Sequence, residues 1–105
     1  MIVARICKHK GEYKSFSFRG HAEYDEEGRD IVCAAVSMLV INTANALQRL
    51  TGNRLKGSND DGIWFEFTDA PDESGRLLID TMLMGLEDVQ KKYGKGYIKL
   101  ISEEV

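Results

Sequence analysis

A histidine and a cysteine twelve residues apart are the side chains of this sequence best suited to covalent chemistry. His21 follows a glycine, and Cys33 stands in an apolar segment behind a short acidic stretch. A thiolate is a strong nucleophile, and an imidazole beside it can take the thiol proton and later protonate a leaving amine. The pair therefore indicates nucleophilic acyl transfer, provided that the fold brings the two side chains together.

Asp30 and Ser37 accompany Cys33 at helical spacing. Asp30 suits the N-cap of a helix, because its carboxylate can accept hydrogen bonds from the first-turn amides. Cys33 then lies in the first turn, where the helix dipole favours the thiolate. Three roles stay open for Asp30: it caps the helix, it orients His21, or its charge opposes thiolate formation. Ser37 shares a helix face with Cys33, so it either bonds the Cys33 carbonyl or reaches into the site.

Each of these residues also has a structural interpretation. Free cysteines are among the most buried residues, and spacing alone favours Cys33 as an inert core thiol. His21 by itself is typical of a surface or capping histidine, and Ser37 of a small packing residue. Cys7 and His9 share one face of a predicted strand, but two ligands are too few for a metal site. We therefore predict neither a metal nor a cofactor.

Two strands and one long helix are predicted for the first half of the chain. Alternating residues predict strands over Ile2–His9 and Tyr13–Arg19, joined by a turn. Asp30 begins a helix of about twenty residues that ends near Gly52. Its first three turns are apolar almost all round, which predicts burial on more than one side. The expected core positions of this helix are Val32, Val36, Leu39, Val40, Thr43, Leu47 and Leu50.

A hairpin, a second helix and a last strand are predicted for the rest. Segments 54–56 and 63–68 flank the turn sequence GSNDDG, with Trp64 on the face opposite the core. A helix opens at 71–73 and ends at Gly94, and residues 97–101 form a strand. The expected core positions here are Ile63, Phe65, Phe67, Leu78, Met82, Leu86, Val89 and Tyr93. The order strand-strand-helix-strand-strand-helix-strand predicts an α+β fold, with two helices packed on a mostly antiparallel five-stranded sheet, in one domain over residues 1–105.

Composition limits the classes of partner. The chain has 105 residues and a net charge of −3, and no stretch is rich in Lys and Arg. Direct nucleic-acid binding is therefore not expected, although net charge hides a local basic patch. The longest uncharged run, residues 31–48, contains several polar residues and is interpreted as a core helix, not a membrane span. Without a signal-peptide pattern, we expect a cytoplasmic protein with free thiols and no membrane partner.

The stretch GHAEYDEEGRDIVCAAVS resembles the signature of the bacterial ribosomal-processing cysteine protease family, the Prp family. The signature contains Gly20, His21, Asp30, Cys33 and Ser37. The downstream stretch GLEDVQKKYGKGYIKL resembles the C-terminal helix and last strand of the same family. Its one noted departure is a glycine at position 94, where the family often has proline, and this position is outside the signature.

The resemblance implies a cysteine endopeptidase that removes the short N-terminal extension of large-subunit ribosomal protein twenty-seven. Cys33 would be the nucleophile, His21 its base, and Gly20, Asp30 and Ser37 supporting residues. The resemblance also implies a homodimer and a mobile loop between His21 and Asp30 that gates the site. The alternative is a non-catalytic ribosome-associated binding module, in which Cys33 packs and the acidic loop binds a basic protein tail.

Overall fold

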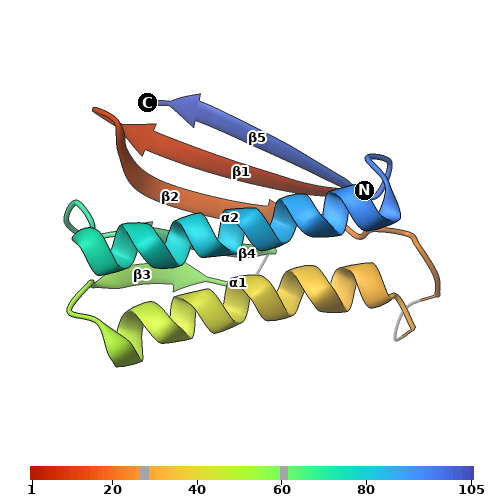
Figure 1. Cartoon of the computed structure of the whole chain (residues 1–105), viewed down its shortest axis with the longest axis horizontal. Coiled ribbons are helices and arrows are strands. Elements are labelled where there is room, and N and C mark those ends of the chain that lie inside the picture. Colours follow the sequence, from red (N-terminus) through yellow and green to blue (C-terminus); the bar gives the residue numbers. More distant parts are fainter. Residues whose placement is uncertain (27–28, 60–61) are drawn as a thin grey trace.

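Two helices cover one face of a five-stranded sheet in the computed structural model, which describes residues 1–26, 29–59 and 62–105 (Figure 1). The elements in chain order are β1 (Ile2–His9), β2 (Glu12–Arg19), α1 (Ile31–Leu50), β3 (Leu55–Ser58), β4 (Ile63–Phe67), α2 (Glu73–Tyr93) and β5 (Ile98–Glu104). This order confirms the predicted α+β fold.

The sheet has the strand order β3-β4-β2-β1-β5. Within the described strands, β1–β2, β2–β4 and β3–β4 are antiparallel, whereas β5 runs parallel to β1. A parallel neighbour needs a crossover, and α2 supplies it by returning the chain across the sheet. The ends of β2 and the starts of β1 and β5 therefore meet at one end of the sheet, where α1 also begins (Figure 1).

The core lies between the sheet and the two helices. Period-two alternation on the strands and helical periodicity on α1 and α2 point one apolar side of each element into it. Its buried members include Ile2, Ala4, Ile6, Phe16, Phe18, Val32, Val36, Val40, Leu47, Phe65, Phe67, Ile79, Met82, Leu86 and Ile98. Among the described helices, α1 alone is long and apolar enough to cross a membrane. The buried side of α1 contributes to this core, as predicted.

Some predictions for α1 are wrong. Leu50 is 80% exposed, because it is the last residue of the helix and lies beyond the core, to which Leu47 is the last α1 contributor. Ile31, Met38 and Ile41 are also exposed, so a single chain buries only one side of α1. Gly52 follows the helix but does not end it in a left-handed conformation.

Thr51 closes α1 in place of a left-handed glycine. Its backbone is extended, and its hydroxyl donates to the Leu47 carbonyl at 2.6 Å. The same hydroxyl accepts a hydrogen bond from the Asn53 amide at 3.1 Å. The side chain thus provides the polar partners that the helix end requires.

The later elements differ from prediction by small shifts. In α2 the buried residues include Gly75 and Ile79, which the predicted stripe missed, while Leu78 is only half-buried. The strand β3 includes Gly57 and Ser58, which were assigned to a turn. Residues 60–61 of that predicted turn lie outside the described residues. Gly94 ends α2 as predicted, with a positive φ of 110°.

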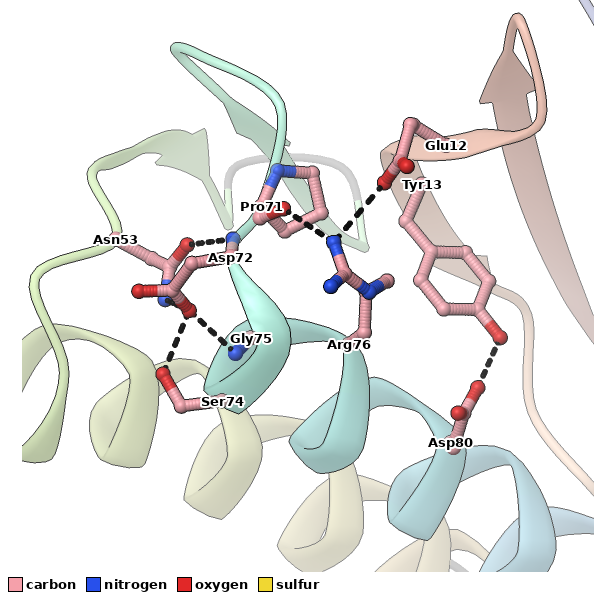
Figure 2. Close-up of polar contacts among 9 residues, drawn as sticks. All are labelled: Glu12, Tyr13, Asn53, Pro71, Asp72, Ser74, Gly75, Arg76 and Asp80. Carbon is pink, nitrogen blue, oxygen red and sulfur yellow. Dashed lines mark hydrogen bonds and ion pairs between the residues drawn. The ribbon is translucent and has the colours of Figure 1, made fainter.

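A polar cluster joins the end of α1 to the start of α2 (Figure 2). The Asp72 carboxylate caps α2 by accepting from the Gly75 amide at 2.9 Å and the Ser74 hydroxyl at 2.6 Å. The Asn53 side chain donates to this carboxylate at 2.9 Å and accepts from the Asp72 amide at 3.1 Å. The hydrogen bonds from Ser74, Asn53 and Gly75 lower the pKa of Asp72 to about 2.

Two further contacts attach α2 to β2 (Figure 2). Arg76 lies 3.6 Å from the Glu12 carboxylate, and Tyr13 donates a hydrogen bond to Asp80. Burial and this hydrogen bond raise the pKa of Tyr13 to about 12. These contacts fix the helices relative to the sheet at the end opposite the start of α1.

Candidate active site

A cavity of about 440 Å³ opens at the N-terminal end of α1. It is lined by His21, Glu23, Asp25, Asp30, Cys33, Ala34 and Ser37. Four of the five predicted site residues therefore share one cavity, although they come from the end of β2, from the loop and from the helix. The fifth, Gly20, lies directly before His21.

The Cys33 thiol is held between the helix and the start of the loop. The residue is in the first turn of α1 and half-buried. Its Sγ accepts a hydrogen bond from the backbone amide of Ala22 at 3.1 Å. Ala22 is itself only 2% exposed, so its residue packs at the edge of the core. The sulfur therefore faces the cavity with a backbone donor beside it.

The Asp30 carboxylate joins the helix to the loop. Its Oδ1 accepts from the amides of Val32 and Cys33, each at 3.0 Å, and its Oδ2 accepts from the Tyr24 amide at 3.0 Å. Desolvation raises the pKa of Asp30, but hydrogen bonds from the Cys33 and Tyr24 amides and the Cys33 thiol outweigh it and hold that pKa below its ordinary value. The structure thus shows Asp30 as the helix cap and as an acceptor for the loop amide of Tyr24.

His21 lines the cavity with an exposed side chain. In the described part of the chain, no hydrogen bond joins its ring to Cys33 or to Asp30. Catalytic hydrogen bonds in substrate-free enzymes are often long and tighten only when substrate binds. The structure therefore brings the pair to one cavity without a hydrogen bond between them.

Gly20 determines how the chain enters the site. Its φ is +89°, and a Cβ built on it would lie 2.5 Å from the Met1 carbonyl oxygen. Both the left-handed backbone and the close approach require glycine. The residue thereby fixes the backbone from which His21 projects.

The loop after His21 is anchored by an aromatic cluster that the sequence analysis missed. The ring of Tyr24 packs edge-on against Tyr93 at 5.3 Å and Tyr97 at 5.1 Å between centroids. Glu23 just before it has a positive φ of 58°, which is uncommon for a residue with a side chain. Residues 27–28 of the predicted gate lie outside the described residues. Tyr24 is the one large apolar residue in the sequence of this loop, so it was the position at which packing against the core could be expected.

A metal centre requires several ligating side chains close together. Over residues 1–26, 29–59 and 62–105, no group of three or more His, Cys, Asp and Glu side chains is placed to hold a metal ion. The groups of this cavity that can act as nucleophile or base include the Cys33 thiol and the His21 imidazole.

Sequence comparison identifies the family of this chain. The profile of a protein family described as "Cysteine protease Prp" matches residues 1–99. The chain belongs to this family. A Prp relative from Bacillus subtilis (strain 168), named ribosomal processing cysteine protease Prp, is 37% identical over 101 residues, which cover 89% of this chain and 90% of the relative.

Solved Prp structures show the same fold. The Staphylococcus aureus ribosomal processing protease Prp, in complex with a covalently linked product peptide, superposes with a TM-score of 0.89 at 28% identity, covering 97% of this chain and 99% of that one. Its complex with a substrate peptide gives a TM-score of 0.83 at 27% identity over the same shares. The present chain is accordingly a ribosomal processing cysteine protease, and the predicted family and enzyme class are confirmed.

Proposed function

We propose that this Prp protease removes the N-terminal extension of large-subunit ribosomal protein twenty-seven through a Cys33–His21 acyl-enzyme mechanism. The observation that carries the proposal is the Cys33 thiol in the first turn of α1, on one cavity with His21. The Prp relatives named as ribosomal processing proteases support it.

The reaction proceeds in two steps. His21 accepts the Cys33 proton, and the thiolate attacks the scissile carbonyl. The C–N bond then breaks as the imidazolium protonates the leaving amine, which leaves a thioester on Cys33. Water, deprotonated by His21, hydrolyses the thioester and frees the new carboxyl group and the thiol. Ser37 and Ala34 form the helical wall against which the peptide lies.

The Asp30 cap limits which backbone amides can donate a hydrogen bond to an oxyanion. The amides of Val32 and Cys33 are near the nucleophile, but both already donate to Asp30. The Ala22 amide, 3.1 Å from Sγ, is a backbone donor that faces the reacting atom. We assign it to the developing oxyanion, whose position next to sulfur is within reach of the same N–H.

The wall opposite α1 fits a basic substrate. Glu23 and Asp25 line the cavity from the loop, and both are exposed carboxylates. A cavity with carboxylates on one wall raises the local concentration of cationic peptides. The tails of ribosomal proteins have this character.

The protein is proposed to act in the cytoplasm as a homodimer. Exposed apolar side chains gather on the outer side of the helical layer: Ile31, Met38, Ile41, Leu77 and Met84. A second copy that covers them would explain why the first turns of α1 are apolar almost all round. Two free cysteines fit a reducing compartment.

The test uses the extended ribosomal protein as substrate and intact mass as the readout. Wild type should release the extension, Cys33→Ala should release none, and Cys7→Ala should match wild type because Cys7 lies on β1 away from the cavity. His21→Ala should reduce turnover by at least a hundredfold. Cleavage that persists in Cys33→Ala would overturn the mechanism.

Alkylation separates the protease from the binding-module alternative. Iodoacetamide should label Cys33 rapidly near neutral pH, whereas a merely structural thiol reacts slowly. Slow labelling together with tight binding of the uncleaved substrate would support the module instead.

A further inference from the structure

The face of the sheet that the helices leave uncovered holds a groove around an exposed tryptophan. The groove measures about 360 Å³ and is lined by Val3, Arg5, Ser17, Arg19 and Trp64. The Trp64 side chain is 38% exposed, although β4 is an inner strand of the sheet. The proposed peptidase mechanism uses none of these residues.

Strand register places an arginine and the indole in one row across the sheet. Arg5 on β1 is opposite Ser17 on β2, and Ser17 is opposite Trp64 on β4. Neighbouring strands are about 4.8 Å apart, so Arg5 and Trp64 stand roughly 10 Å apart with a small residue between them. This spacing leaves the indole open beside a cation.

The next row adds two cations. Val3 on β1 lies between Lys99 on β5 and Arg19 on β2. Both cationic side chains are exposed. The groove is therefore flanked by positive charge on two rows, at the end of the sheet where β2 leads into His21.

Carboxylates on this face lie in a different row. Glu103 is opposite Cys7, and Glu66 is opposite Ser15. Glu103 accepts one hydrogen bond from Arg5 Nη1 at 2.8 Å, which leaves other guanidinium N–H groups as donors. Among the described residues, no carboxylate lines the groove.

We propose that this groove binds single-stranded RNA, with a base stacked on Trp64 and phosphates at the surrounding cations. An open sheet face on which an aromatic ring and two arginines line one groove is suited to base stacking and to binding backbone phosphates. A protein partner would bind the helical layer better, because most of the exposed apolar side chains lie there. The proposal is independent of the peptidase proposal.

Direct binding is measured with a fluorescein-labelled twelve-nucleotide oligouridine. We expect a Kd on the order of 10 µM at low salt and weaker binding as salt rises. Trp64 is the one tryptophan of the chain, so its fluorescence should be quenched as an unlabelled oligouridine binds.

Three variants locate the site. Trp64→Leu should weaken binding at least fivefold, and Arg5→Gln should weaken it and reduce the salt slope by about one. Lys91→Gln is the matched control, because it removes one positive charge from exposed α2 without touching the sheet face. It should leave the affinity within twofold. Unchanged far-UV circular dichroism and Cys33 alkylation will show that each variant is folded.

Several results would overturn the proposal. These are an unquenched Trp64, equal affinity in Trp64→Leu, or tighter binding of oligodeoxythymidine than of oligouridine. A Trp64→Leu protein that changes from dimer to monomer with unaltered RNA binding would assign the face to a second copy of the chain instead.

Discussion

Gly20 is the residue on which the placement of His21 most directly depends. In Gly20→Ala the new Cβ would meet the Met1 carbonyl oxygen at 2.5 Å in a left-handed backbone, so the peptide before His21 must move. We expect kcat/KM to fall at least tenfold, because a displacement of about 1 Å in a catalytic group has effects of this size. Steady-state cleavage of the extended substrate measures it.

Gly11 provides the matched control for this change. It also has a positive φ, of +79°, but a Cβ there would meet nothing within 4 Å. Gly11→Ala should therefore cost about 1–2 kcal/mol of left-handed strain and leave kcat/KM unchanged. Equal losses of activity in the two variants would show that strain alone, and not the position of His21, is responsible.

Asp72 makes the stability of the fold depend on pH in the acid range. Its folded pKa of about 2 is below the ordinary value of 3.8. A depressed carboxyl pKa stabilises the folded state above about pH 4, and this contribution is lost as pH falls from there to about 2. Asp72→Asn should be less stable than wild type at pH 6, and the difference should shrink by pH 2. Urea unfolding at several pH values measures it, and a constant difference would contradict the assignment.

The loop between β2 and α1 is held by few contacts, and these suit a segment that opens. In the described part, the Tyr24 ring contacts Tyr93 and Tyr97, and the Tyr24 backbone amide donates a hydrogen bond to Asp30. We expect amides 22–26 to exchange hydrogen faster than those of α2 in the free protein, and to slow at least tenfold when substrate peptide binds Cys33→Ala. Mass-spectrometric hydrogen exchange tests this. Strong protection in the free protein that peptide leaves unchanged would exclude a gate.

Elements determined by neighbouring residues were predictable from sequence. Ile2–His9 was predicted with the observed bounds because alternation is local, and Asp30 was predicted as the cap because its partners are two and three residues away. The parallel pairing of β5 with β1 was not predictable, since it depends on how α2 crosses the sheet. Ile79 was missed because neighbouring helical positions carry similar apolar residues and only packing selects among them.

Part of the cavity lining was predictable from sequence, but its contacts were not. The signature named four of the seven residues that line the cavity, whereas no residue type indicated that the Ala22 amide donates to Cys33 or that Tyr24 packs on Tyr93. A backbone amide carries no sequence information about its target. By contrast, a capping Asp30 was expected from sequence to occupy first-turn amides, and it does accept from the amides of Val32 and Cys33.

On the scale of the whole molecule, the two layers present different surfaces. Met38 is 67% exposed and Met84 is 60% exposed on the helical layer, whereas the uncovered sheet face is mostly polar. If the helical layer is the dimer interface, Met38→Lys with Met84→Lys should shift the protein to monomer. Sedimentation velocity measures this. Val105→Lys is the control, because Val105 is 63% exposed at the end of the sheet and should leave the assembly unchanged. A double variant that sediments like wild type would exclude this interface.

The close approach of Gly20 to Met1 places the start of β1 beside the cavity that His21 lines. A cleavable peptide joined to Met1 through a flexible linker would therefore be presented to its own Cys33 at millimolar effective concentration. Such a fusion would process itself at a rate independent of protein dilution. The fusion would report cleavage within a single chain. The same peptide fused after Val105, beyond the end of β5, would have to reach the site from the opposite end of the sheet.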